Sequence, residues 1–181
     1  MKLLIASDLH GSAYYTQMLL AREAQEAPEK LILLGDVLYH GPRNDLPRDY
    51  APKQVIAQLS PLASKILCVR GNCDGEVDQM VLPFPVLADY GWLYLDGRTV
   101  YLTHGHVINK AHPLAFAKGD ILLHGHTHIP ACEDCGDFMY LNPGSVSIPK
   151  EGSAHSYMVY ENGVFCWKDL LTGERYLEYR L

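Results

Sequence analysis

The chain has 181 residues, of which 48% are hydrophobic and 20% are charged, and its formal net charge is −6 at neutral pH. This balance is typical of a globular protein and excludes a disordered tail or a fibre. The negative charge argues against a broad basic surface for long nucleic acid. Because domains commonly contain about 100–200 residues, we expect a single domain over residues 1–181.

The cysteines and the apolar runs indicate the cellular compartment of the protein. The apolar run at the N-terminus meets charge at Asp8, and no later run approaches the roughly 20 apolar residues of a membrane span or resembles a secretion signal. The five cysteines are odd in number and scattered, which fits a reducing environment better than a disulfide framework. We therefore expect a cytoplasmic protein without a membrane partner.

The first half of the chain alternates apolar runs with helical patterns. The apolar runs predict strands at residues 2–7, 30–34 and 65–69. Between them, helical spacing predicts helices over residues 12–27, with Ser12 as the N-cap, and over residues 52–60. Strands that alternate with helices favour a parallel arrangement. The polar segment 36–52 is long enough for a functional loop beside the substrate.

The second half changes to short β-like segments from about residue 92 onward. These segments lie at residues 99–103, 121–123, 138–141, 157–160 and 164–167. Between the last two, Asn162-Gly163 favours a tight hairpin turn. The two halves together predict an α/β fold, a two-sheet sandwich flanked by helices in α/β/β/α layers.

Side chains that can bind metal ions follow the predicted strands. They are Asp8, His10, Asp36, Asn72, His104, His126 and His128. One Asp-x-His or Gly-Asp pair alone is more often an ordinary turn, but loops beyond the carboxyl ends of strands converge on one crevice, so the conjunction predicts one pocket.

The ligand types define the expected metal. Imidazole, carboxylate and amide groups suit Mn²⁺, Fe²⁺ or Zn²⁺ better than Ca²⁺. Seven side chains are too many for one tetrahedral ion, and they fit two ions that share a bridging carboxylate. We choose Asp36 as the bridge.

Five motifs carry a family resemblance. In chain order they are Asp8-x-His10-Gly11, Gly35-Asp36, Gly71-Asn72-x-Asp74, Thr103-His104-Gly105-His106 and Gly125-His126-Thr127-His128. Together they resemble the calcineurin-like metallophosphoesterases over nearly the whole chain. Further stretches, at residues 34–38, 40–44, 70–74 and 142–147, look similar to the bacterial YfcE-type phosphodiesterases within that family.

The resemblance implies a division of the ligands between two ions. One ion would be held by Asp8, His10, Asp36 and His128, and the other by Asp36, Asn72, His104 and His126. It also implies Mn²⁺ as the preferred metal, with Fe²⁺, Zn²⁺, Ni²⁺ or Co²⁺ as alternatives. The expected activity is hydrolysis of small phosphodiesters by a hydroxide between the metals, in a protein that is a possible homo-oligomer.

Other residues receive roles from the same resemblance. Asp36, Asn72, Cys73 and His104 are the expected catalytic residues. Cys73 departs from the wider family, in which a histidine at this position is thought to protonate the leaving group. His106 is expected beside the metals without binding them. Arg43 and Asn44 are expected to bind phosphate oxygens, although a solvated loop is at least as good an interpretation.

Two alternatives to a phosphodiesterase stay open. One is a non-catalytic scaffold of the same fold that acts through protein contacts, and the other is a phosphomonoesterase. The pair Cys132-x-x-Cys135 raises the separate question of a zinc or redox site. Since no second cysteine pair is present, we expect a reduced pair in a β-turn.

Overall fold

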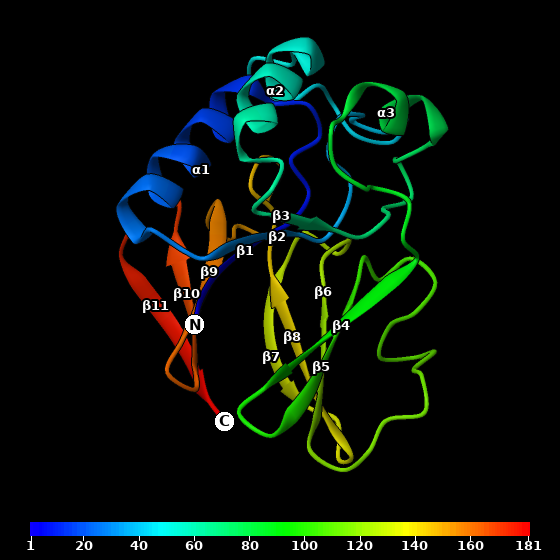
Figure 1. The fold of residues 1–181 in the computed structure, drawn as a ribbon, viewed down its shortest axis with the longest axis vertical. Coiled ribbons are helices and arrows are strands. Elements are labelled where there is room, and N and C mark those ends of the chain that lie inside the picture. Colours follow the sequence, from blue (N-terminus) through cyan, green and yellow to red (C-terminus); the bar gives the residue numbers. More distant parts are fainter.

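The computed structural model describes residues 1–181 and consists of two facing β-sheets with a group of helices at one end (Figure 1). The helices are α1 (Ala13–Glu26), α2 (Pro52–Leu59) and α3 (Glu76–Val81), with a short 3₁₀ turn at Ser60–Leu62. The strands are β1 (Lys2–Ala6), β2 (Lys30–Leu33), β3 (Ile66–Cys68), β4 (Tyr90–Leu95), β5 (Arg98–Thr103), β6 (Asp120–His124), β7 (Pro130–Asp134), β8 (Phe138–Pro143), β9 (Ser156–Glu161), β10 (Val164–Asp169) and β11 (Arg175–Arg180).

The first sheet contains six strands in the order β11-β10-β9-β1-β2-β3. Strands β1, β2 and β3 are parallel, with Leu4 opposite Leu31 and Leu31 opposite Ile66. The later strands β9, β10 and β11 extend this sheet in antiparallel fashion. The parallel core that strand–helix alternation predicts is therefore confirmed.

The predicted helices are confirmed with their start signals. Helix α1 begins after Ser12, whose side-chain oxygen accepts the N–H of Tyr15 at 3.2 Å, and its C-cap residue Ala27 adopts the left-handed conformation. Helix α2 begins with Pro52, which suits the first helical turn because no intrahelical bond needs its missing N–H.

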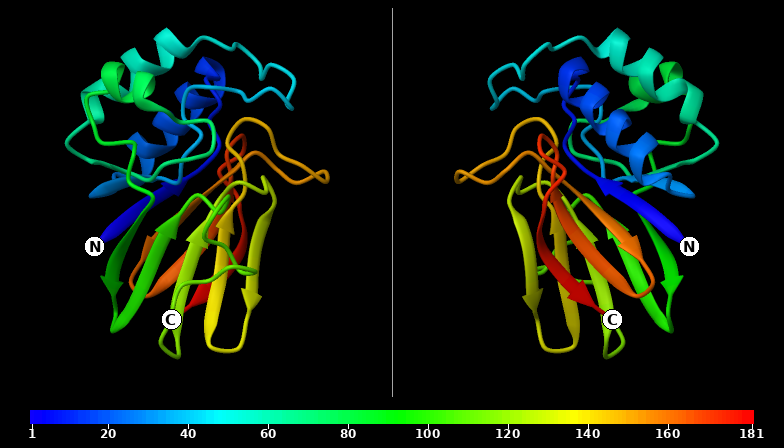
Figure 2. Two further views of the ribbon diagram at one scale, coloured as in Figure 1. Left: turned by 90° about the vertical axis from the view of Figure 1, so that its right-hand side faces the viewer. Right: turned by 90° about the vertical axis from the view of Figure 1, so that its left-hand side faces the viewer.

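The second sheet contains five strands in the order β4-β5-β6-β8-β7. Its inner strands β5, β6 and β8 are parallel, and β4 and β7 pair antiparallel at the two edges. In both sheets the parallel strands therefore send their carboxyl ends toward the end of the sandwich where the helices lie (Figure 2).

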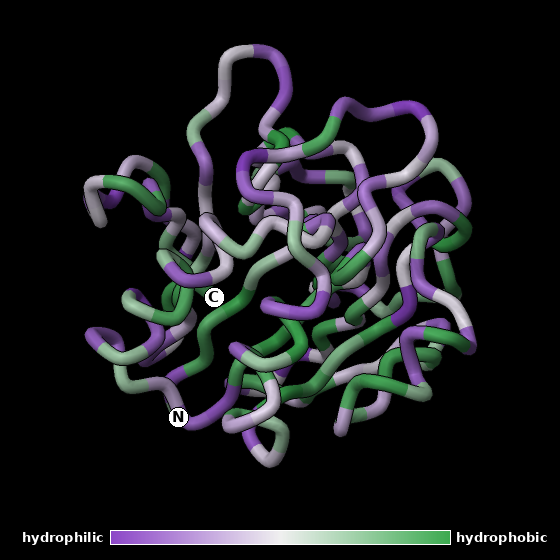
Figure 3. Tube along the Cα trace, turned by 90° about the horizontal axis from the view of Figure 1, so that it is seen from above, coloured by the Kyte–Doolittle hydropathy of each residue, from purple (hydrophilic) through white to green (hydrophobic).

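The hydrophobic core forms layers on and between the sheets. One cluster joins α1 and α2 to one face of the first sheet, through residues such as Leu19, Val55 and Leu33. A second cluster lies between the sheets and includes Ile5, Leu123 and Trp167. The predicted two-sheet sandwich is thus confirmed, and hydrophobic segments run through its middle while hydrophilic loops lie outside (Figure 3).

The outer face of the second sheet is covered differently from that of the first. A small cluster of Leu122, Phe138 and Tyr140 lies there, against Ile108 and Phe116 from the irregular segment 104–119. The helical layer accordingly lies on the first sheet, and irregular chain takes its place on the second. None of the helices combines the length with the apolar composition that a membrane span requires.

Strand β4 carries an exposed row of aromatic side chains at the edge of the second sheet. Tyr90, Trp92 and Tyr94 are 50%, 63% and 67% exposed. Because side chains alternate along a strand, the three rings share one face. Large apolar groups on an unpaired edge mark a surface suited to association.

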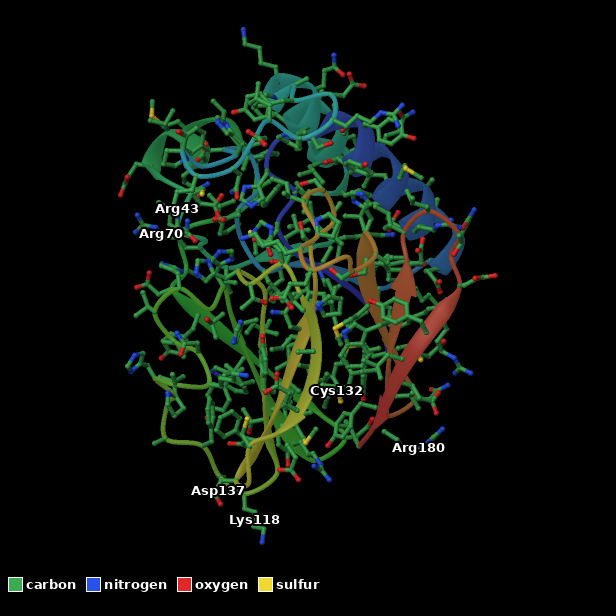
Figure 4. All side chains as sticks on the ribbon, turned by 180° about the vertical axis from the view of Figure 1, so that it is seen from behind. Arg43, Arg70, Lys118, Cys132, Asp137 and Arg180 are labelled. Carbon is green, nitrogen blue, oxygen red and sulfur yellow. The ribbon has the colours of Figure 1, made fainter.

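The five cysteines are all free. Cys132 lies within β7 and Cys135 follows the strand at the start of the turn to β8, so the expectation of a pair inside a turn is wrong for Cys132. Figure 4 shows Cys132 far from Arg43, which lies at the helical end of the molecule. Burial raises the pKa of both thiols, so neither has the character of a reactive thiolate.

Candidate metal centre

The expected ligands follow the carboxyl ends of five parallel strands. Asp8 and His10 come after β1, Asp36 after β2 and Asn72 after β3, while His104 follows β5 and both His126 and His128 follow β6. Both sheets therefore contribute to one site, which no single sheet could build.

One group of ligand atoms surrounds Asp8 Oδ1. The Nε2 atoms of His10 and His128 lie 3.3 Å from each other, and they lie 3.6 Å and 3.3 Å from Asp8 Oδ1. Asp36 Oδ2 lies 3.6 Å from His10 Nε2. All four residues are buried, and Asp8 Oδ1 has no hydrogen-bond partner.

A second group surrounds the Nε2 atom of His104. Asn72 Oδ1 lies 3.1 Å from this nitrogen, His126 Nδ1 lies 3.2 Å from it and Asp36 Oδ2 lies 3.4 Å from it. Asp36 Oδ2 thus lies within 3.6 Å of a nitrogen in each group. The structure brings together all seven residues that the sequence singles out.

The imidazoles are oriented for a cation by their outer nitrogens. The Nδ1 atoms of His10, His104 and His128 face the carbonyl oxygens of Tyr39, Leu34 and Ile148 at 2.8, 2.6 and 2.6 Å. A carbonyl only accepts, so each Nδ1 is the donor and each Nε2 points into the centre, where it offers a lone pair once it carries no proton. Imidazole nitrogens and carboxylate oxygens that converge in this way fit a metal cation.

The charges of the centre interact strongly. Burial would raise the pKa of Asp8, but its contacts with His10 and His128 hold it well below the ordinary value. Burial would likewise lower the pKa of His104, but the carboxylates of Asp36 and Asp8 raise it to about 9. Without a metal, the carboxylates therefore retain a proton on His104 at neutral pH.

The backbone at the centre is unusually left-handed for residues other than glycine. The φ angles are 59° at Asp8, 48° at His10, 54° at Asp36, 66° at His126 and 64° at His128. Such a conformation costs of order 1 kcal/mol for each residue and persists where the surroundings impose it. The fold therefore fixes the direction of these side chains before any ligand binds.

Two glycines permit the close approach of the loops. A Cβ atom on Gly71 would lie 2.1 Å from Asp36 Oδ1, and one on Gly125 would lie 1.9 Å from Ser7 Oγ. Neither position tolerates a side chain, because non-bonded heavy atoms do not approach so closely. Glycine is required here by space rather than by backbone conformation.

Asp74 supports the centre although the sequence analysis gave it no role. It is 4% exposed, and its carboxylate accepts the N–H groups of Asp36, Gly71 and Val37 at 2.7, 2.7 and 2.9 Å. The loops after β2 and β3 are thereby held together. In the sequence, only the position of Asp74 in the motif Gly71-Asn72-x-Asp74 singles it out.

A second support comes from the segment after β8. The Nδ2 atom of Asn142 donates to the Gly125 carbonyl at 2.8 Å, while the hydroxyls of Ser145 and Ser147 donate to the Asp8 carbonyl at 3.0 and 2.9 Å. These bonds attach the β8 loop to the loops after β1 and β6. In the sequence, residues 142–147 stand out only through the family resemblance.

A cleft of about 420 Å³ opens over the centre. Arg43 and Asn44 line it, but the Asn44 amide also donates to the His40 carbonyl at 2.8 Å and so stabilises its own loop. Lys150, which the sequence analysis missed, lines the same cleft from the loop before β9. Two positively charged side chains, from two different loops, thus border the site.

Cys73 and His106 lie at the margin of the centre. The backbone N–H of Cys73 donates to Asp36 Oδ1 at 2.8 Å, and burial together with the Asp36 charge raises the pKa of its thiol. The thiol therefore stays protonated. The ring of His106 lies 5.5 Å from that of His104, which agrees with its expected place beside the ligands.

Comparison with known proteins gives extended matches. The family model described as the calcineurin-like phosphoesterase superfamily domain matches residues 1–162. Phosphodiesterase YfcE of Escherichia coli K12 is 48% identical over 164 residues, which are 91% of this chain and 89% of that protein. The solved structure of YfcE, a phosphoesterase from E. coli, superimposes with a TM-score of 0.96 at 44% identity and covers 99% of each chain.

A more distant match shows how widely the fold occurs. Vps29 of Entamoeba histolytica has a TM-score of 0.66 and 21% identity, and the match covers 100% of this chain and 99% of that one. At this identity the likeness concerns the fold alone.

Proposed function

This chain belongs to the calcineurin-like phosphoesterase superfamily and is a metal-dependent phosphoesterase, and from that premise we propose that it hydrolyses small phosphodiesters at a centre of two divalent metal ions, preferably Mn²⁺. The curated relative YfcE is named as a phosphodiesterase, which supports the diester over the monoester. The five unpaired cysteines support a site of action in the reducing cytoplasm.

The observation that carries the proposal is the convergence of metal-ligating atoms on Asp36. The Nε2 atoms of His10 and His104, each fixed by a carbonyl behind it, lie 3.6 and 3.4 Å from Asp36 Oδ2. In our assignment Asp8, His10, Asp36 and His128 hold one ion, and Asp36, Asn72, His104 and His126 hold the other. This complete set of ligands supports catalysis over a scaffold role.

Divalent ions held there would polarise the phosphate and supply a hydroxide nucleophile at neutral pH, because a bound cation lowers the pKa of water from 15.7 to about 7. Hydrolysis joins the water oxygen to phosphorus and breaks one ester P–O bond, and the departing alkoxide takes up a proton. Arg43 and Lys150, which line the cleft, are suited to bind the phosphate oxygens.

The arrangement offers no strong acid to protonate the leaving group. Cys73 occupies the sequence position where the wider family is thought to have a histidine proton donor, but its raised pKa makes the thiol a poor acid. We therefore propose a preference for diesters whose leaving alcohols are already acidic, such as nitrophenol.

Metal removal and restoration test the proposal. Chelated protein should lose hydrolysis of bis(4-nitrophenyl) phosphate and regain it with Mn²⁺, and elemental analysis should find two metal ions per chain. Hydrolysis of 4-nitrophenyl phosphate serves as the monoester comparison. Full diester hydrolysis by protein that elemental analysis finds free of metal would refute the proposal.

A further inference from the structure

Three hollows meet at the candidate metal centre. The central cleft of about 420 Å³ contains Asp36 and His128. A hollow of about 660 Å³ shares Asn72 and Cys73 with this cleft, and another of about 530 Å³ shares His126 and Thr127 with it. We call the hollow that shares Asn72 and Cys73 the apolar hollow, and the hollow that shares His126 and Thr127 the polar hollow.

The apolar hollow lies between α2, α3 and the loop after β2. Its lining includes Leu38 and Ile56 together with Val77 and Val81 of α3, which are 72% and 47% exposed. The tyrosines at positions 39 and 50 also line it, and the acidic residues Glu76 and Asp78 border it. Exposed apolar side chains beside a strongly polar site are typical of a pocket for an apolar or aromatic group.

The polar hollow is lined by hydrogen-bonding groups from the segment after β5 and from strand β7. The Lys110 ammonium pairs with Glu133 Oε2 at 2.7 Å and lies 5.4 Å from the centre of the Tyr140 ring. His106 also lines this hollow. Such a mixture of donors and acceptors suits an alcohol that bears hydroxyl or amide groups.

His124 adds an unsatisfied buried group to the wall of the polar hollow. Its Nδ1 lies 3.0 Å from the Gly125 carbonyl and its ring stacks on Tyr140, with centroids 4.3 Å apart. Its Nε2 is buried without any partner in the protein. The His124 ring therefore makes the wall of the hollow polar from behind, although its Nε2 is too deeply buried to contact a bound molecule.

Two side hollows suit a diester for a geometric reason. The two ester oxygens on tetrahedral phosphorus diverge, so a diester bound at the centre extends two groups in two directions, whereas a monoester extends one. We propose that the substrate is an asymmetric phosphodiester, with an apolar or aromatic group in the apolar hollow and a polar, hydroxyl-bearing group of nucleoside type in the polar hollow. This inference rests on the proposed phosphodiesterase function.

Two diesters with one leaving group test the inference. In methyl 4-nitrophenyl phosphate the second ester group is an apolar methyl, whereas in thymidine 5′-(4-nitrophenyl phosphate) it is a polar nucleoside. Wild-type protein with Mn²⁺ should have the higher kcat/KM for the thymidine ester. Ala111→Trp places an indole at the rim of the polar hollow and should reduce the ratio of thymidine to methyl kcat/KM by about tenfold or more.

A second substitution separates the two hollows. Val77→Trp obstructs the apolar hollow and should lower kcat/KM by about tenfold for both esters, because both carry the nitrophenyl group. The matched control is Leu171→Trp, at a position that is 47% exposed and lines none of the three hollows. This variant should leave kcat/KM for both esters unchanged.

Inhibition gives a readout that does not depend on cleavage of the thymidine ester. Thymidine 5′-monophosphate should inhibit methyl ester hydrolysis more strongly than inorganic phosphate does, and Ala111→Trp should remove this advantage. If wild type cleaves both esters but Ala111→Trp leaves their ratio unchanged, the inference is wrong and the phosphodiesterase function stands. If wild type cleaves neither ester with Mn²⁺, the proposed function fails and the inference with it.

Discussion

The carboxylate of Asp74 accepts the backbone N–H of Asp36 at 2.7 Å, so a residue that is not an expected ligand positions the expected bridge between the metals. The same carboxylate accepts two more N–H groups, from Gly71 and Val37. It therefore acts as a buried link between the loops after β2 and β3.

Asp74→Ala should destabilise the protein strongly, because three buried N–H groups lose their acceptor. We expect the free energy of unfolding to fall by about 3 kcal/mol, measured by urea denaturation of metal-free protein. Asp74→Asn should cost less, since its amide oxygen still accepts. The control is Asp137→Ala, at an exposed turn whose side chain makes no hydrogen bond. Equal stability of the Asp74 and Asp137 variants would contradict this role.

Metal affinity should rise with pH between about 7 and 9. The folded-state pKa of His104 is raised to about 9, so a proton occupies the ring at pH 7 and the metal must displace it. Calorimetric Mn²⁺ titrations in buffers of different ionisation enthalpy should reveal this proton release. The free energy of unfolding of the metal-free protein should change with pH in the opposite direction to metal affinity. The ion pairs of His104 stabilise the fold fully below pH 6.5, and that contribution is lost as pH rises through about 9. A pH-independent affinity would show that His104 binds no metal.

Asp36→Asn should reduce diester hydrolysis far more than Arg43→Ala. Loss of the proposed bridging carboxylate would disturb both proposed ion sites and should lower kcat by about a thousandfold, whereas loss of the Arg43 charge should cost about tenfold. Arg180→Ala, near the C-terminus and away from the site in Figure 4, is the control for the loss of an arginine. A folded Asp36→Asn protein with near wild-type kcat would exclude Asp36 as the bridge.

Cys73→His should extend hydrolysis to diesters with poor leaving groups. An imidazolium is a better acid than the Cys73 thiol, whose pKa burial and Asp36 raise, and general-acid assistance contributes roughly 10²–10⁴ in rate. Cys73→Ala should change hydrolysis of a nitrophenyl diester little. The measurement is kcat/KM for both variants on one activated and one alkyl diester. A hundredfold loss for Cys73→Ala on the nitrophenyl diester, with unchanged metal content, would show direct participation of the thiol.

Trp92→Lys should weaken self-association if the protein is an oligomer, because the aromatic row of β4 is the largest group of exposed rings on an unpaired strand edge. Sedimentation velocity over a range of concentrations measures the change. Leu171→Lys places the same charge on an exposed apolar position elsewhere and should have no effect. If both variants sediment like the wild type, β4 is not an association surface.

Much of the fold could be predicted because its signals are local. Strand β1 is a continuous buried run, and helix α1 begins with a capping serine, so pattern and propensity agree. Helix α3 escaped prediction because it has only six residues and exposes Val77 and Met80, so no apolar face is visible in its sequence. Strands β7 and β11 escaped because one begins with a proline and the other consists mainly of charged and exposed residues.

The candidate site divides in the same way. Candidate ligands such as Asp8 and His104 are visible because they follow apolar strands. The contributions of Asp74, Asn142 and Lys150 depend on which backbone groups or cleft lie beside them, and only the three-dimensional arrangement of the loops determines that. A polar side chain that accepts backbone N–H groups has no periodic signature in a sequence.

The left-handed backbone at the candidate ligands has a consequence for directed evolution. At His126, with φ of 66°, glycine would suit the backbone better than histidine, but glycine offers no ligand atom. Thermal stability therefore favours glycine at such positions, whereas metal binding favours a side chain with a ligand atom. A library of this protein selected for thermal survival alone would accumulate sequences that fold well and have lost the centre, so any such selection must retain an activity screen in every round.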